Sequence, residues 1–299
     1  MRGTLQHMKR EIEKETPPAR NLSRRKAISL IGATAAASLV GGAGEQFASA
    51  EQTSALTKKT EGRLARIDAK PAPIAIDTAK TAVIVVDMQN DFGSKGGMFD
   101  RAGIDISTIQ RAVSPTALVL GMARKAGMKI VYLKMAYRPD LSDIGTPESP
   151  NWRVHQQIMH VGTKVSAPNG AESRILVRDT WNTDIVDELK PEPADTVIYK
   201  SRFSGFYETE LDSKLKAMGA RYLIFTGCTT SVCVESTIRD AMFRDYSPVL
   251  LADCTAEPLG YGLPRSNHEA TLFLIQMMLG WVSSSQEFVK ALESVGPSA

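Results

Sequence analysis

Strand-length apolar runs alternate with helical segments along most of this 299-residue chain, and this alternation constrains its fold more than any other feature. Five runs rich in β-branched residues have the continuity expected of strands that are buried on both faces. They are TAVIVVD (81–87), MKIVYLKMA (128–136), TVIYK (196–200), RYLIFTG (221–227) and SPVLLADC (247–254). Strands that alternate with helices predict right-handed βαβ crossovers, and hence an α/β fold with a parallel sheet covered on both faces.

The segments between these runs carry helix signals, with one exception. Ser107 is a candidate N-cap and Gly127 a candidate C-terminal stop for the first helix, in which Pro115 predicts a kink or a split. Residues 265–282 are predicted as one long final helix. Residues 137–180 are instead rich in Pro, Gly and Ser, and so long an irregular stretch inside a compact domain is usually a lid or a binding loop.

Charge is distributed unevenly along the chain. Residues 1–50 contain eight Lys/Arg and four Asp/Glu, which leaves 28 basic and 29 acidic residues for positions 51–299. The formal net charge of +3 therefore originates in the N-terminal segment. Because the remainder lacks the basic excess that phosphate backbones require, we expect no nucleic-acid partner.

The N-terminal segment has the layout of an export signal. Arg24 and Arg25 precede an apolar run that carries no charge before Glu45, and a small-residue cleavage site follows at 48–50. Paired arginines favour export by the twin-arginine route. We therefore expect a periplasmic or exported protein, or a cytoplasmic one if the leader does not function. Ala27 stands where Phe is usual, so a disordered or membrane-anchoring N-terminus is the alternative. The run is short and rich in Gly and Ala, and we expect no membrane span in the mature chain.

These patterns divide the chain into three regions. Residues 1–50 form the predicted export signal, residues 51–79 a linker and N-terminal arm that lies on the domain, and residues 80–299 the domain itself. The chain contains three cysteines. We expect all three to be free thiols, because the twin-arginine route exports proteins that have folded in a reducing cytoplasm.

Three chemically active side chains lie where predicted strands end. Asp87 ends the first strand, Lys200 ends the third, and Cys233 opens the helix after the fourth. Because ligands of parallel sheets bind at the carboxyl ends of the strands, we expect these side chains to converge. A helix N-terminus and the Lys200 ammonium both favour the thiolate of Cys233. Asp87 is suited to take the thiol proton and pass it to a leaving amine, while backbone N–H groups of the turn GCTTSVC face an oxyanion.

Each of these residues has an ordinary structural explanation when it is taken alone. A strand-end aspartate often caps, a strand-end lysine is often solvated, and a single cysteine is often part of a core. The three histidines considered as alternative bases are His155, His160 and His268. None of them lies at a strand end, so we expect structural or solvent-exposed roles for them. The joint occurrence of Asp, Lys and Cys at three matched strand ends favours a catalytic triad.

Longer motifs around these residues resemble a known family. VIVVDMQNDF, YKSRFSGF and TGCTTSVCVESTIRDA together resemble the isochorismatase-like cysteine hydrolases, most of all their ureidoacrylate amidohydrolase branch, over about residues 80–293. The resemblance implies a three-layer αβα sandwich around a six-stranded parallel sheet and an Asp87–Lys200–Cys233 triad. It also implies a cis peptide between Cys228 and Thr229, which aims the amides of Thr229 and Cys233 at the oxyanion.

The resemblance further implies an activity. Members hydrolyse C–N bonds of small-molecule amides and ureides through a thiol-bound acyl intermediate, so we expect such a substrate and no cofactor. Nicotinamidases of the family bind a metal through an Asp and several His after the second strand, where this chain has KMAYRPDLSD without His, so we expect no metal. Other amidase activities of the family (nicotinamidase, biuret or N-carbamoyl amino acid hydrolase) and a non-catalytic binding module stay open as alternatives. We also expect a homo-oligomer.

The side chains expected to face the substrate are mostly apolar. They are Phe92, Met98, Met135, Tyr137, Trp152, Arg202 and Phe203. A small, charged ureido acid would call for an arginine clamp, for which Arg202 and Arg153 are the candidates. The apolar lining instead predicts a bulkier or less charged amide or urea.

Overall fold

The computed structural model describes residues 64–260 and 263–295. The export signal predicted for residues 1–50, and the linker as far as residue 63, lie outside the described residues. None of the helices in the described ranges combines the length and the apolar character needed to cross a bilayer.

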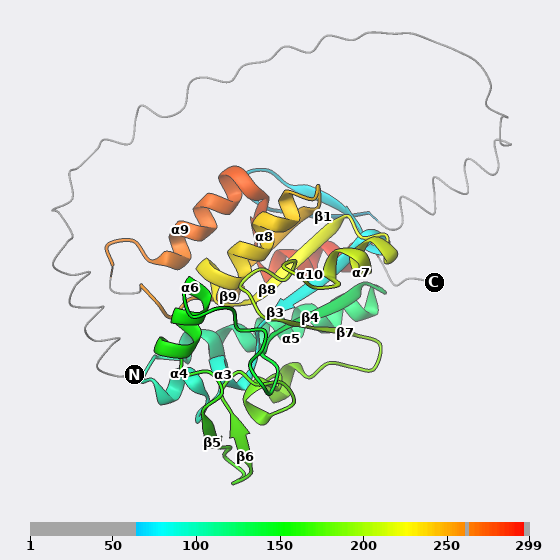
Figure 1. The fold of residues 1–299 in the computed structure, drawn as a ribbon. Coiled ribbons are helices and arrows are strands. Elements are labelled where there is room, and N and C mark those ends of the chain that lie inside the picture. The colour runs from blue at the N-terminus through cyan, green and yellow to red at the C-terminus, as the bar shows by residue number, and fades with distance from the viewer. Residues whose placement is uncertain (1–63, 261–262, 296–299) are drawn as a thin grey trace, which may run out of the picture. The chain divides into compact units, whose positions relative to one another are not determined.

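A six-stranded parallel sheet forms the centre of the described domain (Figure 1). Its strands are β3 (Thr81–Val86), β4 (Lys129–Met135), β7 (Thr196–Lys200), β8 (Tyr222–Cys228), β9 (Ser247–Ala256) and β10 (Trp281–Ser283). Their spatial order is β10-β9-β8-β3-β4-β7, and every neighbouring pair is parallel. The predicted six-stranded parallel sheet is therefore confirmed, and all six residues of β3 are buried because both faces of the sheet are covered.

Helices cover the two faces and complete the predicted αβα sandwich (Figure 1). The α-helices are α3 (Asn90–Gly93), α4 (Met98–Arg101), α5 (Ser107–Lys125), α6 (Pro150–Trp152), α7 (Leu211–Ala217), α8 (Glu235–Met242), α9 (Asn267–Leu274) and α10 (Ser285–Glu293). The short 3₁₀ turns are η1 (Thr78–Lys80), η3 (Trp181–Thr183) and η4 (Asp187–Leu189), and the π-helical turns are η2 (Arg153–Ile158), η5 (Thr230–Val234) and η6 (Ile275–Leu279). α5 and α10 pack against each other and against the sheet. α8 and α9 each contact the π-helical turns η5 and η6.

The first helix differs in two ways from its prediction. α5 is one helix that Pro115 does not split, because six residues at helical spacing bury one continuous face of it. Ser107 is the first helical residue, so Ile106 and not Ser107 occupies the N-cap position, and the Ser107 amide donates to Asp105 Oδ1 at 2.9 Å. Gly127 has a φ of 70° and its amide donates to the carbonyl of Arg124, which confirms it as the stop.

The single final helix predicted for residues 265–282 is wrong. α9 passes into η6, and Trp281–Ser283 then enter the sheet as β10 before α10 follows. Gly280 makes this change of direction possible, since a Cβ there would lie 2.3 Å from the carbonyl oxygen of Pro248. Only glycine lets the chain approach β9 so closely.

The predicted irregular excursion contains regular structure of its own. It holds α6, η2 and a hairpin of β5 (Lys164–Ser166) and β6 (Glu172–Arg174). The Tyr137 amide donates to the Leu176 carbonyl at 2.8 Å and the Arg178 amide to the Tyr137 carbonyl at 2.9 Å, so the excursion returns to the end of β4. Residues ahead of the sheet form a second hairpin, β1 (Leu64–Ile67) with β2 (Ile74–Asp77).

Candidate active site

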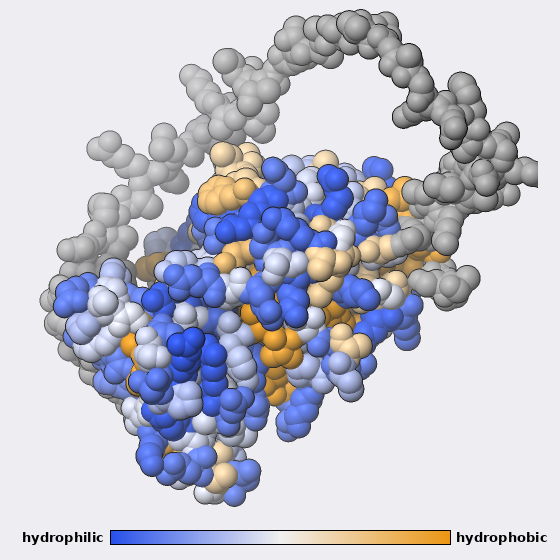
Figure 2. Space-filling view, turned by 45° about the vertical axis from the view of Figure 1, so that its right-hand side comes forward, coloured by the Kyte–Doolittle hydropathy of each residue, from blue (hydrophilic) through white to orange (hydrophobic). Residues whose placement is uncertain are grey.

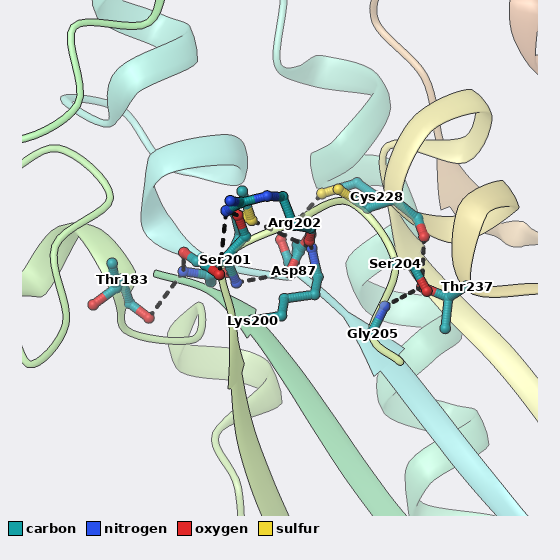
Figure 3. Close-up of polar contacts among 12 residues, drawn as sticks. Asp87, Thr183, Lys200, Ser201, Arg202, Ser204, Gly205, Cys228 and Thr237 are labelled. Carbon is teal, nitrogen blue, oxygen red and sulfur yellow. Dashed lines mark hydrogen bonds and ion pairs between the residues drawn. The ribbon is translucent and has the colours of Figure 1, made fainter. Parts of the chain in front are cut away.

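Asp87 and Lys200 form a buried ion pair at the carboxyl edge of the sheet (Figure 3). Asp87 follows β3 with a φ of 51°, a conformation that is uncommon for a residue other than glycine. Its Oδ1 accepts a hydrogen bond from the Met135 amide at 2.8 Å, and its Oδ2 lies 2.7 Å from Nζ of Lys200, the last residue of β7. Among the described residues, Oδ2 has no other well-aligned hydrogen bond, so it retains a lone pair for a proton from a neighbour.

Burial and the opposite charge act against each other in this pair. Burial raises the pKa of the Asp87 carboxyl above its ordinary value, although the Lys200 ammonium opposes the rise. For Lys200 burial acts to lower the pKa, but the negative charges of Asp87 and Cys233 outweigh it and the pKa is raised. Lys200 therefore stays protonated as the fixed positive charge of the site.

Cys233 lies in η5, the π-helical turn that follows β8, with 6% of its surface exposed. Its thiol is within hydrogen-bonding reach of both the Asp87 carboxylate and the Lys200 ammonium. Burial raises the pKa of the Cys233 thiol, and the Lys200 charge offsets this only in part. Lys200 thus favours the thiolate, as expected, but desolvation opposes it more strongly, so the pKa of the thiol is raised on balance.

The turn after β8 leaves three amides without an acceptor outside the turn. The peptide between Cys228 and Thr229 is cis, as the family resemblance implies. The amide of Ser231 donates to Glu257, and those of Val232 and Val234 donate to the Thr229 carbonyl. The amides of Thr229, Thr230 and Cys233 have no acceptor outside η5 in the described part of the chain, and the two that the family resemblance implies for the oxyanion, Thr229 and Cys233, are among them.

Several residues predicted to face the substrate surround the triad. Met135 is buried with its sulfur 3.5 Å from Lys200 Nζ. Tyr137 is fully buried, and its hydroxyl donates to the Ser201 carbonyl at 3.1 Å. Burial raises the pKa of that phenol, although the hydrogen bond from Asn151 opposes the rise. Phe203 follows three residues after Lys200 and is half-buried.

The other predicted lining residues lie in short helices near the site. Phe92 in α3 packs edge-to-face on Phe99 at 5.1 Å between ring centroids. Met98 begins α4 and is buried. Trp152 ends α6 and is half-buried. These placements are compatible with a wall of the site, and their contact with a substrate stays a prediction.

Arg202 is bound to the backbone of the excursion. Its Nη1 donates to the carbonyls of Ser201 at 2.7 Å and Asp143 at 2.9 Å, and its guanidinium lies 5.4 Å from the ring centroid of Tyr207. Arg153, the other candidate clamp, is exposed on η2. Arg202 therefore fixes the excursion at the end of β7 (Figure 3), and one of its two terminal nitrogens is already occupied.

His155 belongs to the wall of the site, which the sequence pattern alone did not reveal. Its ring lies between Tyr137 and Phe203, with centroids 5.3 and 5.5 Å away, and it is 1% exposed. Nδ1 donates to the Asn151 carbonyl at 2.8 Å. Burial, with a smaller contribution from the charges of Lys200 and Arg202, lowers the pKa of this imidazole to about 4, so it is neutral at pH 7.

The other two histidines differ in their surroundings. His160 is exposed. His268, at the start of α9, is half-buried and places Nδ1 3.0 Å from the hydroxyl of Thr230 in the nucleophile turn. Structural or solvent-exposed roles for these histidines stay a prediction.

Gln89 and Asp91 hold the backbone around the triad and were also missed. Gln89 is fully buried, and its side-chain oxygen accepts from the Met135 amide at 2.7 Å while its nitrogen donates to the Met135 carbonyl at 3.1 Å. Asp91 accepts from the amides of Met98 at 2.9 Å and Leu176 at 2.7 Å. Their two- and four-residue spacing after Asp87 in DMQND was the signal in the sequence.

A cavity lies apart from the nucleophile, which is itself almost fully buried. A cavity of about 300 Å³ is lined by residues of α5, β9 and α9, and none of the triad residues contributes to its lining. In the described ranges, no group of three or more His, Cys, Asp or Glu side chains is arranged to hold a metal ion. The three cysteines are free and buried, as expected.

Known proteins are similar to this chain in sequence and in fold. Residues 81–287 match the isochorismatase domain family. A relative from Caulobacter segnis named ureidoacrylate amidohydrolase RutB is 38% identical over 231 residues, which cover 77% of this chain and 93% of the relative. A protein of the same name from Methylorubrum extorquens is 41% identical over 228 residues, which cover 76% of this chain and 89% of the relative.

A solved structure agrees with these relatives. The crystal structure of a cysteine hydrolase from Pseudomonas syringae pv. phaseolicola superimposes with a TM-score of 0.61 and 28% sequence identity. The match covers 78% of this chain and 98% of that chain. The resemblance drawn from the motifs is confirmed, and the chain belongs to the isochorismatase family.

Proposed function

We propose that this protein is a cysteine-dependent amidohydrolase that cleaves a C–N bond of a ureido, carbamoyl or amide substrate through a covalent thiol-acyl intermediate. The buried Asp87–Lys200 pair beside the thiol of Cys233 is the observation that carries the proposal. The relatives named ureidoacrylate amidohydrolase support the same class of reaction.

The reaction begins at the thiol. The substrate carbonyl oxygen binds to the free amides of Thr229 and Cys233, and Asp87 takes the thiol proton as sulfur attacks the carbonyl carbon. Collapse of the tetrahedral intermediate breaks the C–N bond, and Asp87 returns its proton to the leaving nitrogen. For a substituted urea this releases an amine and leaves a thiocarbamate on sulfur.

Water completes the cycle. Asp87, now deprotonated, takes a proton from a water molecule that attacks the thioester carbonyl, and the same two amides hold the second oxyanion. The thiol is regained, and the carbamate product decays to ammonia and carbon dioxide. Lys200 remains charged throughout and stabilises whichever of its two neighbours is negative.

For the substrate, we propose a substituted urea or carbamoyl compound with an apolar group beside the scissile bond. Met135, Tyr137 and Phe203 support this, because they offer apolar surface near the triad. The two backbone contacts of Arg202 support it as well, since they reduce its availability as a carboxylate clamp. Burial of one apolar substituent contributes roughly 1.5–3 kcal/mol, or one to two powers of ten in preference.

A substrate panel tests this proposal. Ureides, carbamates, amides and nicotinamide are assayed for release of ammonia or amine, and kcat/KM is compared across the panel. We expect apolar ureides to be hydrolysed faster than ureidoacrylate. A preference for nicotinamide, or for small anionic ureido acids over every apolar analogue, would contradict the assigned pocket.

The location of the protein is a separate proposal. The pattern from Arg24 to residue 50 supports export to the periplasm. Residues 1–50 fused to a reporter that requires export should carry it across the cytoplasmic membrane, and the double substitution Arg24→Lys with Arg25→Lys should stop transport. Cytoplasmic retention of the unmutated fusion would refute the assignment.

We also propose that the chain forms a homo-oligomer. Figure 2 shows apolar areas within a mostly hydrophilic surface. Phe273, Met277 and Met278 on α9 and η6 are exposed by 49%, 57% and 71%, and apolar surface of this kind supports association. Sedimentation of the protein and of a Met278→Glu variant tests this, and a monomeric unmutated protein would refute it.

A further inference from the structure

The side chain of Glu257 holds the turn that presents the nucleophile. Glu257 directly follows β9, whose last residue Ala256 pairs with Cys228 at the end of β8. Its Oε2 accepts hydrogen bonds from the amide of Ser231 at 3.1 Å and from the Ser231 hydroxyl at 2.5 Å. Its Oε1 accepts from the Leu259 amide at 2.9 Å. The carboxylate thus joins the end of one strand to the turn after its neighbour.

A carboxylate at this position requires an explanation. Glu257 is 1% exposed, and no cation of the described residues lies within ion-pair distance of it. Burying an unpaired carboxylate costs free energy and raises the pKa of Glu257, and the three donors offset this in part. Two of these donors are backbone N–H groups on opposite sides, and a glutamine nitrogen would face one of them. Only a carboxylate accepts from all three at once.

The neighbouring residue of β9 supports the same turn. The hydroxyl of Thr255 donates to the Gly227 carbonyl at 2.7 Å and lies 3.0 Å from the hydroxyl of Thr230. Thr230 and Ser231 are therefore both held from the side of β9. The amides of Thr229 and Cys233 flank this held segment, and in the described part of the chain neither has an acceptor outside η5.

From this arrangement we infer that Glu257 is a positioning residue for the oxyanion site: by binding the backbone and side chain of Ser231, it holds the amides of Thr229 and Cys233 toward the carbonyl oxygen of the substrate. This inference rests on the proposed function. Glu257 touches neither the substrate nor the thiol, so its effect passes through the backbone. A displacement of about 1 Å in such a site costs on the order of 100-fold in rate.

The test separates the oxyanion site from the nucleophile by two probes of Cys233. Butanal adds to the thiol: a C–S bond forms, the carbonyl π pair moves to oxygen, and the thiol proton follows, so the adduct oxygen occupies the oxyanion site. Methyl methanethiosulfonate carries no carbonyl: the thiolate forms a disulfide with it, and methanesulfinate leaves. Binding of butanal depends on the amides, whereas the rate of disulfide formation depends on the thiol alone.

Glu257→Gln should lower kcat about tenfold and weaken butanal binding by the same factor, because one N–H group is left facing the new amide nitrogen. KM and the rate with methyl methanethiosulfonate should stay within about threefold of the unmutated protein. Glu257→Ala should lower kcat about 100-fold. Ser231→Ala keeps the N–H donor that fixes the backbone, so it should cost about threefold or less. Circular dichroism confirms that each variant is folded.

Glu269→Gln is the matched control. Glu269 accepts from the amide of Ser266 at 3.3 Å and from its hydroxyl at 3.0 Å, the same pair of groups, but at the exposed start of α9. It should leave kcat and butanal binding unchanged. An unchanged kcat in folded Glu257→Gln and Glu257→Ala, or an equal loss in disulfide formation, would overturn the inference. A protein that binds butanal in a Glu257-dependent way but hydrolyses no member of the panel would refute the proposed function alone.

Discussion

Ionisation of Asp91 should make the stability of this protein fall as pH rises toward neutrality. Asp91 is fully buried in α3, and its carboxylate accepts from two backbone amides and from the side chain of Asn182. Burial outweighs these donors and raises the pKa of Asp91 from 3.8 to about 7. The folded protein therefore holds a proton between about pH 4 and pH 7 that the unfolded chain has already released.

The magnitude follows from linkage. A carboxyl with a raised folded-state pKa contributes stability that is complete below its unfolded value near pH 4 and is lost as pH rises through about 7. The difference between the two pKa values corresponds to ~4 kcal/mol. The free energy of unfolding of a domain is roughly 5–15 kcal/mol, so Asp91 alone accounts for a large fraction of that free energy.

Urea unfolding of the protein and of Asp91→Asn between pH 5 and pH 8 measures this contribution. The amide is neutral at every pH and resembles the protonated acid in shape, so the variant should lack the Asp91 part of the pH dependence. The free energy of unfolding of the variant should be lower than that of the unmutated protein at pH 5, and this difference should shrink by several kcal/mol between pH 5 and pH 8. A deficit that is constant over this range would show that Asp91 titrates near its ordinary value, and would refute the reasoning.

The triad gives further expected outcomes. Cys233→Ala should abolish turnover while the fold is retained, and near-normal activity in the folded variant would refute the mechanism. Asp87→Asn and Lys200→Ala should each lower kcat by two or more powers of ten, with the double variant little worse than either; small, additive losses would show independent action. Methyl methanethiosulfonate should label Cys233 faster than Cys228 or Cys254, as mass spectrometry can show, since only Cys233 is measurably exposed. Prolonged chelation should leave activity unchanged, and loss with recovery on adding zinc would contradict this expectation.

The order of strands and helices was predictable from periodicity, whereas the boundary between the last predicted helix and β10 was not. Five buried strands stand out because their apolar runs are continuous and β-branched. β10 has only three residues and continues the apolar pattern of the preceding helix, so local signals could not separate them. The close approach of Gly280 to Pro248 decides this boundary, and it depends on tertiary structure.

The site was predictable as far as strand topology determines it. Asp87, Lys200 and Cys233 meet because carboxyl ends of parallel strands share one edge, which holds whatever the loops do. Glu257 and His155 are positioned by a neighbouring strand end and by the excursion, and no local pattern states those contacts. The protonation of the thiol could not be predicted either, because it depends on how deeply the turn is buried.

The protonated state of the Cys233 thiol explains how the triad avoids the free-energy cost of burying a second negative charge. Burial raises the pKa values of both Asp87 and Cys233, so each ionised form is expensive on its own. Transfer of the proton from sulfur to the carboxylate, however, creates no additional buried charge. Lys200 is within reach of both groups, and the negative charge moves from one of its partners to the other.

Burying the ionised form of either acid costs free energy. The two costs largely cancel when the proton is transferred, because one buried anion replaces the other. When sulfur attacks, the same negative charge moves on to the carbonyl oxygen, where the amides of Thr229 and Cys233 are available to receive it. The site holds one ammonium and one mobile negative charge at every step. In the proposed mechanism, the position of the amides of Thr229 and Cys233 therefore matters more for this charge transfer than the acidity of the thiol.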